Sequence, residues 1–251
     1  METAPSSATP TSIAAAIAKR LKKAGDPDKA GPMQAYTKCS MPYFGVQAPE
    51  LRQICDEVFR SQQLATAAAW RSAIAHLWDS ATHQELRYAA IELAAYPAYQ
   101  RFISMALVPL YRRLVQEGAW WDTVDALASR VAVLLAAYPA PLAKTLRAWA
   151  KQDNMWLRRV AIIAQVGARE TTDRTLLYDC IGPSIDSKEF FLRKAIGWAL
   201  REYAKADPGE VRRYLRAHRA NLSPLSVREA EKGLDRAKRH GILKKSTRRK
   251  R

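Results

Sequence analysis

Apolar side chains recur along this chain with the spacing of an α-helix. Stretches of about 12 to 20 residues carry them at three- and four-residue intervals, and Pro, Gly or a capping residue separates one stretch from the next. The alternation typical of a half-buried strand does not occur. We therefore predict an all-α fold of about a dozen helices. After residue 100, the expected helices are 105–117, 119–137, 140–152, 154–168, 173–182, 187–206, 208–219 and 227–239.

The beginning of the chain has recognisable start and stop signals. Thr11 or Ser12 can cap a first helix that ends near Gly25, and Pro32 can open a short second helix through Tyr36. These residues predict two helices before the first long loop.

Further helix starts follow the loop expected at residues 40–48. Pro49 suits a first helical position, and Thr66 can begin the next helix. Capping boxes, in which a small polar residue precedes Glu by three positions, mark three more starts. They are Thr-His-Gln-Glu at 82–85, Asp-Ser-Lys-Glu at 186–189 and Ser-Val-Arg-Glu at 226–229.

Two Tyr-Pro-Ala triplets indicate a repeated unit. They begin at Tyr96 and Tyr138, about 42 residues apart, and each lies between two predicted helices. A period of about 40–47 residues is typical of HEAT and armadillo repeats, in which neighbouring helices stack in sequence. We predict a HEAT-like α-solenoid with a concave face over residues 11–240, a disordered lead over residues 1–10, and a basic tail over residues 241–251.

The charge of the chain is strongly positive. Its 251 residues hold 41 Lys and Arg against 24 Asp and Glu, a formal net charge of +17. Residues 201–251 hold 17 of these cations and 6 of the acids, a net of +11. This excess suggests a polyanionic partner, either nucleic acid or an anionic membrane surface, and we expect the concave face to be basic.

Familiar metal and cofactor motifs are missing from the sequence. Cys39, Cys55 and Cys180 form no C-x-x-C pair, so we expect reduced thiols. The four histidines have no ligand spacing, and no Walker loop, G-x-G-x-x-G or H-E-x-x-H occurs. An enzyme of this sequence would use no metal and no cofactor. The N-terminus lacks signal-peptide features and the apolar runs are short, so we predict a soluble protein of the bacterial cytosol or nucleoid.

One predicted helix, which begins at Trp120-Trp-Asp-Thr-Val-Asp125, presents an aromatic ring next to an acid. Trp121 and Asp125 are four residues apart and share a face that could receive a ligand. Alternatively, Trp121 completes the core and Asp125 is a solvated or capping acid. Asp122 points off this line and is expected to matter little. The neighbouring stripe, expected to be buried, is Trp120, Val124, Leu127, Val131 and Leu134.

The helix expected at 187–206 carries cations around an indole. This face suits a phosphate backbone with a flat or cationic group at its centre. A surface Trp covered by Lys and Arg stems explains the pattern equally well. In another predicted helix, Arg158 and Arg159 follow Trp156, and at least one of them should face solvent or a ligand. The face of the first helix consists of Lys194, Trp198, Arg201 and Lys205.

Four ordered blocks resemble the AlkD family of alkylpurine DNA glycosylases. Segments 32–36 and 44–49 fit as well, so the likeness covers about residues 12–240. The resemblance implies a HEAT-like fold that cradles duplex DNA and hydrolytic removal of cationic N3- and N7-alkylated purines, without cofactor, by a monomer in base excision repair. The four blocks are Trp120-Trp-Asp-Thr-Val-Asp125, Asp153-Asn-Met-Trp-Leu-Arg-Arg159, Ser187-Lys-Glu-Phe-Phe-Leu-Arg-Lys-Ala-Ile-Gly-Trp198 and Leu222-Ser-Pro-Leu-Ser-Val-Arg-Glu229.

The resemblance also assigns roles by motif position. It implies that Asp125 is the catalytic acid and that Trp121, Trp198 and Arg159 lie in the active site, with Tyr36 as an aromatic beside them. It further implies recognition through the backbone and deoxyribose without full base flipping. The residues expected to contact DNA are Tyr36, Gln47, Lys194 and Arg201.

One carboxylate is chemically sufficient for this reaction. Most glycosidic bonds need two, because one must protonate the leaving group. A purine alkylated at N3 or N7 already carries a positive charge and leaves as a neutral base. Asp125 would then stabilise the oxocarbenium-like deoxyribose and orient the water, while the indole faces of Trp121 and Trp198 add cation–π attraction.

Two other functions are compatible with the same charge and fold. One is a non-catalytic helical-repeat scaffold that binds nucleic acid or an acidic protein, and it does not need Asp125. The other is a damaged-DNA binder that has lost hydrolysis, against which the complete Trp-Trp-Asp-x-x-Asp block speaks. Release of free base from methylated duplex DNA separates the enzyme from both.

Overall fold

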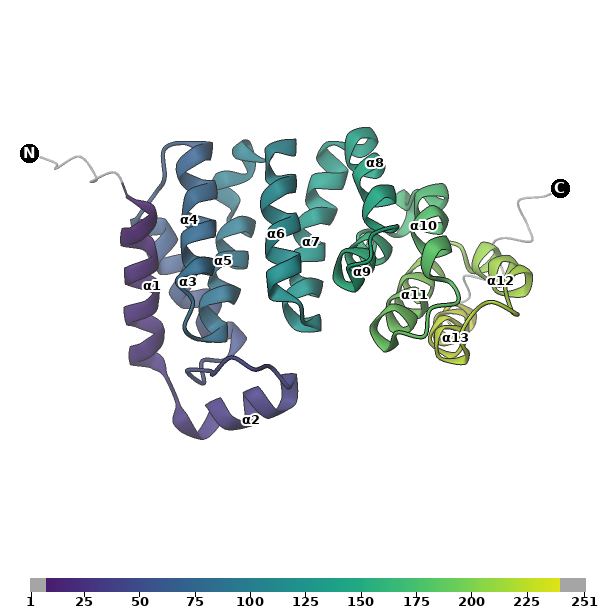
Figure 1. Cartoon of the computed structure of the whole chain (residues 1–251), viewed down its shortest axis with the longest axis horizontal. Helices are drawn as coiled ribbons and strands as arrows, with labels where there is room; N and C mark the ends of the chain where they lie inside the picture. The colour runs from purple at the N-terminus through teal and green to yellow at the C-terminus, as the bar shows by residue number, and fades with distance from the viewer. Residues whose placement is uncertain (1–7, 240–251) are drawn as a thin grey trace, which may run out of the picture. The chain divides into compact units, whose positions relative to one another are not determined.

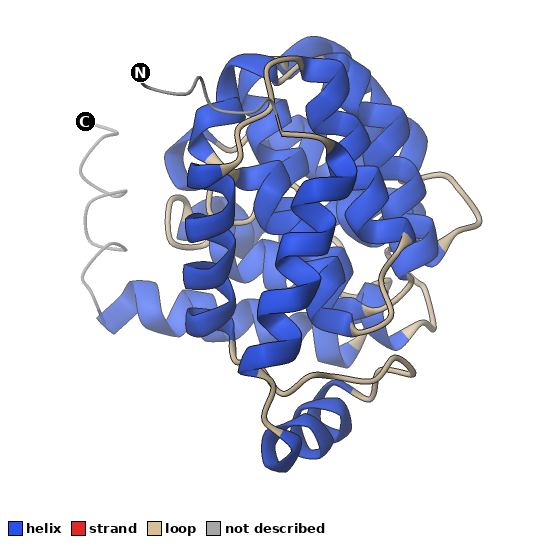
Figure 2. Ribbon diagram, turned by 90° about the vertical axis from the view of Figure 1, so that its left-hand side faces the viewer, coloured by secondary structure: helices blue, strands red, loops and turns tan. Residues whose placement is uncertain are grey.

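The computed structural model describes residues 8–239, which contain thirteen α-helices and no β-strand. Figure 2 shows the helices and the loops that join them. This confirms the predicted all-α fold of about a dozen helices. The predicted tail at 241–251 lies outside the described residues, as does most of the predicted lead, and α1 (Pro10–Ala24) begins at the last position of that lead.

Two compact units, Met1–Ala126 and Leu127–Arg251, make up the chain. The boundary between them lies within α7 (Trp121–Ala137). Each unit has its own packed helices and is described by itself. The single domain at 11–240 and its concave basic face stay predictions.

Four of the first five helices form the core of the first unit, and α2 is not one of them. Helix α1 packs on α3 (Ala48–Ser61) and α4 (Ala67–Asp79), and α5 (Gln84–Ala95) packs on the same two helices (Figure 1). Their apolar faces are removed from water, which is the main favourable term in folding. The buried side chains include Ile13, Ile17, Leu21, Trp70, Ile74 and Leu77. The remaining elements are α2 (Pro27–Thr37), the short helices η1 (Pro97–Phe102) and η2 (Met105–Leu107), and α6 (Val108–Gly118).

The first helix begins earlier than predicted. Its N-cap is Thr9, whose Oγ1 accepts a hydrogen bond from the Ser12 N–H at 3.1 Å, while the Ser12 hydroxyl oxygen accepts one from the Thr9 N–H at 3.1 Å. Pro10 then occupies a first-turn position, where its missing N–H is not needed. The predicted caps at Thr11 and Ser12 were wrong, because the helix already begins after Thr9. Thr66 caps α4 as predicted.

Helix α2 also starts before its predicted first residue. Asp26 caps it by accepting a hydrogen bond from the Asp28 N–H at 3.0 Å, and Pro27 opens it, so Pro32 lies inside the helix rather than at its start. Among its residues only Thr37 is buried. Because α2 buries so little of its own surface, its position depends on the contacts made at its C-terminal end and by the following loop.

The loop over residues 38–47 is held by a buried acid of α5. The carboxylate of Glu85, 0% exposed, accepts hydrogen bonds from the backbone N–H groups of Phe44 at 3.1 Å, Gly45 at 2.9 Å and Val46 at 3.2 Å. Gly45 has φ of 90°, and a Cβ there would lie 2.0 Å from the Asp26 carbonyl oxygen. The predicted capping box at 82–85 was therefore wrong: His83 is the N-cap, and the carboxylate binds the loop instead.

The second unit is built around a close contact between two helices. Helix α11 (Phe190–Tyr203) packs on α13 (Pro224–Arg239), and a Cβ on Gly197 would lie 2.6 Å from Glu229 Cβ. A Cβ on Gly233 would lie 2.6 Å from the Arg201 carbonyl oxygen, so both glycines permit the backbones to approach. The other elements are α8 (Pro139–Trp149), α9 (Met155–Ile163), η3 (Arg169–Thr171), α10 (Arg174–Ile181), η4 (Gly182–Ser184) and α12 (Pro208–Ala217).

Two predicted capping boxes in this unit were also wrong. Helix α11 begins at Phe190 after Glu189, which makes no side-chain cap. Helix α13 begins earlier than predicted because the Ser223 hydroxyl oxygen accepts a hydrogen bond from the Ser226 N–H at 3.0 Å, and a proline suits the first turn. Ser226 instead donates its hydroxyl hydrogen to the Arg193 carbonyl oxygen on α11 at 2.9 Å.

Glu229, the acid of the predicted capping box at 226–229, is buried and forms ion pairs with three cations. Its carboxylate lies 2.5 Å from an Arg201 guanidinium nitrogen, 2.7 Å from Lys232 Nζ and 3.4 Å from Lys194 Nζ. The hydrogen bond from Lys232 and the charge of Lys194 lower the pKa of Glu229, although burial opposes this shift. One carboxylate thus neutralises only one of three neighbouring cations.

We expect the Glu229 cluster to make stability depend on acid pH. Since the folded state holds this carboxyl at a lowered pKa, the unfolded chain takes up the proton first, near pH 4, and the free energy of unfolding falls as the pH drops further. Glu229→Gln should cost about 1–3 kcal/mol at pH 6 and much less at pH 3. Thermal unfolding at both pH values measures this.

The matched control for this prediction is Glu231→Gln. The Glu231 carboxylate pairs with Arg219 at 3.1 Å, and both side chains are about half exposed. Such surface pairs contribute roughly 0–1 kcal/mol, so this variant should resemble the wild type at both pH values. An equal deficit of Glu229→Gln at pH 6 and pH 3 would contradict the electrostatic explanation.

Candidate active site

An aromatic pair forms at the start of α7. The rings of Tyr36, on α2, and Trp121 meet edge to face, with centroids 6.2 Å apart and planes at 76°. Tyr36 is 79% exposed and Trp121 is half-buried, so this pair lies at the surface of the first unit. Asp125 follows one turn after Trp121 and is also half-buried. The first unit therefore brings together Tyr36, Trp121 and the helix face that carries Asp125.

The hydrogen bond between Trp120 and Thr37 fixes α2 against α7. The indole Nε1–H of Trp120 donates to the Thr37 carbonyl oxygen at 2.5 Å. Trp120 was predicted to be buried with its stripe, but it is half-buried because its indole N–H needs this polar partner. The other four members of the stripe, Val124, Leu127, Val131 and Leu134, are buried as predicted.

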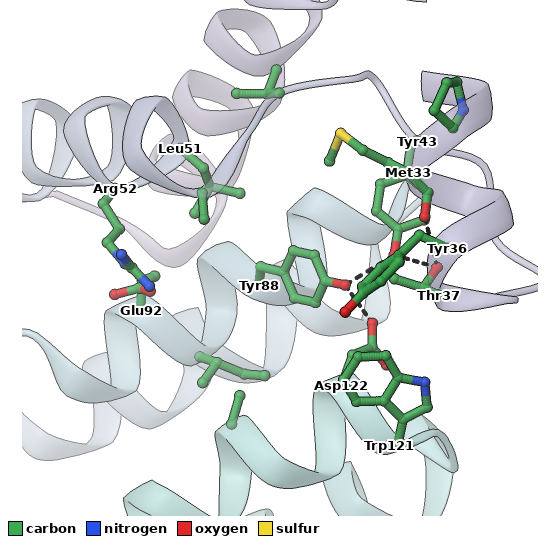
Figure 3. Close-up of a pocket in the computed structure, with 15 residues that line it drawn as sticks. Met33, Tyr36, Thr37, Tyr43, Leu51, Arg52, Tyr88, Glu92, Trp121 and Asp122 are labelled. Carbon is green, nitrogen blue, oxygen red and sulfur yellow. Dashed lines mark hydrogen bonds and ion pairs between the residues drawn. The ribbon is translucent and has the colours of Figure 1, made fainter. Parts of the chain in front are cut away.

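A pocket of about 540 Å³ opens beside the aromatic pair, and all of its lining residues belong to the first unit. Figure 3 shows Tyr36, Tyr88, Trp121 and Asp122 converging on it from α2, α5 and α7, with Arg52 and Glu92 on the side away from Trp121. The lining is mostly apolar and aromatic. It consists of Pro32, Met33, Tyr36, Thr37, Tyr43, Val46, Ala48, Leu51, Arg52, Tyr88, Ile91, Glu92, Trp121, Asp122 and Ala126.

Hydroxyl groups link the pocket wall to Asp122. Tyr88 donates a short hydrogen bond to the Asp122 carboxylate, and the Tyr43 hydroxyl lies 2.9 Å from the Tyr88 hydroxyl. Burial raises the pKa of Tyr43 to about 12 and raises that of Tyr88 further, with the Asp122 charge adding to the shift of Tyr88. Both phenols are therefore neutral donors over the physiological pH range. Tyr43 in turn donates to Thr37 Oγ1 at 3.0 Å.

Asp122 is also anchored on the N-terminal turn of α5. The Gln84 side-chain N–H₂ donates to Asp122 at 3.2 Å and to Thr123 Oγ1 at 2.9 Å, and Thr123 donates to the other Asp122 oxygen at 3.3 Å. Asp122 thus holds the first turn of α7 and faces the pocket, so it is not the inert neighbour of Asp125 that the helical spacing suggested. No local pattern could have revealed this, because Tyr88 and Gln84 lie more than 30 residues away in the chain.

The predicted face of α11 lies in the second unit. Trp198 is half-buried, and Lys194 and Arg201 are both paired with Glu229. Lys205 lies 2.5 Å from Glu202. The cations around Trp198 are therefore held by acids of their own unit, although Glu229 leaves two positive charges in excess.

Arg159 is buried in the second unit, at 5% exposure. One of its guanidinium nitrogens donates to the Phe191 carbonyl oxygen at 2.6 Å, at the start of α11, and its guanidinium carbon lies 5.9 Å from the Phe191 ring. Arg158 is half-buried and donates from Nε to Ser184 Oγ at 3.0 Å. The guanidinium of Arg159 thus contacts the N-terminal turn of the helix that carries Trp198.

Gln47 lies at the surface of the first unit as the N-cap of α3. Its side chain is exposed and makes no capping hydrogen bond. Its neighbours Val46 and Ala48 both line the pocket. The structure therefore places Gln47 between two residues of the pocket wall, and its predicted contact with DNA stays a prediction.

These features describe a helical protein with a pocket, in which aromatic and acidic side chains gather at the start of one helix beside that pocket. The family follows from comparison with known proteins. The family model described as "DNA alkylation repair enzyme" matches residues 17–234. The chain belongs to the DNA alkylation repair enzyme family.

Three solved structures are similar to this chain. A predicted DNA alkylation repair enzyme from Enterococcus faecalis is 31% identical, with a TM-score of 0.75 over 83% of this chain and 95% of that one. AlkD2 from Streptococcus mutans shows the same fold. It is 17% identical, with a TM-score of 0.55 over 75% of this chain and 89% of that one. The same fold occurs in smu.31 from Streptococcus mutans UA159, 16% identical with a TM-score of 0.55 over 89% and 96%. No curated protein matches the chain.

The following statements on membrane helices and metal sites refer to residues 8–239. Within this range no helix has the length and apolar character needed to cross a membrane. No group of three or more His, Cys, Asp or Glu side chains in this range is arranged to hold a metal ion. The three cysteines are free, and burial raises the pKa of each thiol.

Proposed function

We propose that this protein is a monofunctional DNA glycosylase that hydrolyses the N-glycosidic bond of cationic N3- and N7-alkylated purines in duplex DNA. The observation that supports this most is the gathering of Tyr36, Trp121 and Asp125 at one surface of the first unit, in a member of the DNA alkylation repair enzyme family. The similarity to the predicted DNA alkylation repair enzyme from Enterococcus faecalis supports the same class of activity.

The proposed mechanism needs one carboxylate. The N-alkylated purine leaves as a neutral base, so no side chain has to protonate it. Asp125 stabilises the positive charge that develops on the deoxyribose and holds the attacking water, a form of electrostatic stabilisation that acts mainly in the transition state. The Trp121 face adds cation–π attraction to the same charge.

By their motif positions, Trp198 and Arg159, which belong to the second unit, are also proposed active-site residues. Trp198 would supply a second indole face, and Arg159 would act through its charge and through its contact with the start of α11. Tyr36, Gln47, Lys194 and Arg201 are proposed DNA contacts. Lys194, Arg201 and Lys232 outnumber the single carboxylate of Glu229 that they share, although Arg201 also lies 4.0 Å from Glu202. The excess of positive charge in this cluster supports the proposed role, because a phosphate backbone attracts cations.

A base-release assay tests the proposed activity. Duplex DNA methylated with a simple alkylating agent is incubated with the protein, and the free bases are separated by chromatography. We expect release of 7-methylguanine and 3-methyladenine without a metal or cofactor. Binding of the same DNA with no release would favour the non-catalytic scaffold and would overturn the proposal.

Salt-sensitive binding of duplex DNA without strong sequence preference is also expected, because the chain carries a net charge of +17. Removing residues 244–251, which include six cations, should weaken binding evenly on all sequences. The single-turnover rate of base release at saturating protein should stay nearly unchanged. Fluorescence anisotropy at several salt concentrations measures the first effect. Loss of chemistry at saturation would show that the tail belongs to the active site.

A further inference from the structure

Arg87, a half-buried residue of α5, has no partner for its charge within the described chain. Its guanidinium carbon lies 4.7 Å from the centroid of the Trp78 ring, a cation–π contact. Its Nε is buried and has no hydrogen-bond partner among residues 8–239, and the guanidinium pairs with no acid of that range. A desolvated donor without an acceptor costs free energy, so this guanidinium suits an anion from outside the chain.

The Trp78 ring holds the guanidinium of Arg87 in place. The indole is buried, and its Nε1–H donates to the Glu117 carboxylate at 2.9 Å. Glu117 is paired in turn with Arg113 at 3.3 Å. Because packing and a hydrogen bond both fix the ring, an arginine stacked on it loses little further conformational freedom when it binds an anion. The cation is therefore preorganised for a ligand.

The ring that carries Arg87 lies against the end of the helix before α7. A Cβ on Gly118, the last residue of α6, would lie 2.9 Å from the Trp78 ring and 3.0 Å from a Thr123 side-chain carbon. Trp78 thus packs where α6 ends and α7 begins. Arg87, stacked on that ring, belongs to the same junction.

The thiol of Cys39 gives a second indication of where this cation lies. Burial raises the pKa of the Cys39 thiol, the Asp122 charge adds to this rise, and the Arg87 charge opposes it. Both charges therefore act near the same thiol. Along α5, Arg87 directly precedes Tyr88, which donates a hydrogen bond to Asp122. The guanidinium is thus close to the first turn of α7, which also carries Trp121.

Asp122 does not neutralise this cation. Its carboxylate accepts hydrogen bonds from Tyr88, Gln84 and Thr123, which are all neutral donors. A guanidinium is not deprotonated under physiological conditions, so Arg87 keeps its positive charge. The first turn of α7 therefore has a fixed, uncompensated cation beside it.

We propose that Arg87 is a phosphate-binding residue that contacts one backbone phosphate of duplex DNA beside the start of α7. The chain belongs to a family of DNA alkylation repair enzymes, so a DNA phosphate is an anion that it meets. The planar fork of an arginine matches two phosphate oxygens, and such a contact fixes the register of a protein on the duplex. That this phosphate flanks the alkylated nucleotide rests on the proposed function, whereas the contact itself does not.

Equilibrium binding of an undamaged duplex at several salt concentrations tests the contact. The logarithm of the binding constant falls with the logarithm of the salt concentration, by a slope of about one for each phosphate contact. Arg87→Gln should weaken binding about tenfold at low salt and reduce this slope by about one. Arg87→Lys keeps the charge and loses only the fork, so it should keep the wild-type slope. An unchanged slope for Arg87→Gln would overturn the proposal.

A paired arginine of the same unit is the matched control. Arg20, on α1, forms an ion pair with Glu57, and both side chains are about half exposed. Since Glu57 already neutralises this charge, Arg20→Gln should leave the salt slope near that of the wild type. An equal fall in slope for both variants would show an effect of net charge alone and would contradict the proposal. A less stable Arg87→Gln with the wild-type slope would mean that Arg87 only packs on Trp78.

Neutral phosphate analogues locate the contact on the DNA. A duplex with a tetrahydrofuran abasic site, which has no base to release, carries one methylphosphonate at successive positions around that site. The wild type should lose affinity when a phosphate that flanks the abasic site is replaced, and Arg87→Gln should be insensitive at the same position. Equal sensitivity of the two proteins at every position would overturn the proposal. Insensitivity only at a distant phosphate would overturn the placement beside the lesion.

The contact and the proposed function can fail separately. Base release by the wild type, together with an unchanged slope for Arg87→Gln, would overturn the contact alone. A reduced slope without any base release by the wild type would support the contact while overturning the glycosylase activity.

Discussion

Asp125→Asn slows base release by about 10²-fold or more while leaving folding and DNA affinity nearly unchanged. The substitution keeps the size of the side chain and removes its charge, so it removes a contact that acts mainly in the transition state. A factor of this size is usual when one preorganised electrostatic contact is lost. Single-turnover excision of 7-methylguanine at matched occupancy measures it. Trp121 and Trp198 substitutions should fall between the wild type and Asp125→Asn, since each removes one aromatic face.

This experiment needs a control Asp→Asn substitution at a position that makes no contact of its own in the site. Asp122 is close in sequence, but it accepts hydrogen bonds from Tyr88 and Gln84 and faces the pocket, so Asp122→Asn changes more than a charge. Asp235, exposed on α13, is a better match for an Asp→Asn substitution. Asp235→Asn should retain the wild-type rate. Equal rates for wild type and Asp125→Asn would end the proposed mechanism.

Glu85→Ala destabilises the protein by roughly 3 kcal/mol or more, because three buried N–H groups lose their acceptor at once. Glu85→Gln keeps one acceptor oxygen but turns an N–H₂ group toward the loop donors, so it should cost roughly 1–2 kcal/mol. Urea unfolding followed by tryptophan fluorescence measures both values. The loop and α2 also supply six of the fifteen residues that line the pocket, so both variants should disturb its wall.

An exposed acid of the same unit provides the comparison. Glu50 lies in the first turn of α3, where it interacts favourably with the helix dipole and, more weakly, with the charge of Lys29. Glu50→Ala should therefore cost about 0.3–1 kcal/mol. A Glu85→Ala variant as stable as Glu50→Ala would mean that water or another acceptor satisfies the loop N–H groups.

Local patterns predicted the elements and part of the site. The three-to-four residue spacing of apolar side chains identified the helices, since the periodicity of an α-helix depends only on neighbours along the chain. The same spacing placed Trp121 and Asp125 on one face of α7. Helix starts were less certain, because Ser, Thr and Asp near a proline offer several caps, as Thr9 and Asp26 show.

Contacts over long sequence separations could not be predicted in this way. The capping box at 82–85 has the correct local spacing, yet Glu85 binds a loop 40 residues earlier because the buried N–H groups of that loop need an acceptor. The contact of Tyr36 with Trp121 and the network around Asp122 likewise depend on how α2 and α5 pack on the start of α7.

The sequence by itself determined the helical fold, the basic charge and the pairing of an indole with an acid on one helix, since each follows from composition or from spacing along a helix. The tertiary structure alone decided that Asp122 and three tyrosines line a pocket next to that pair. The physical reason is that a buried donor or acceptor binds the partner that packing brings to it, whatever its distance along the chain.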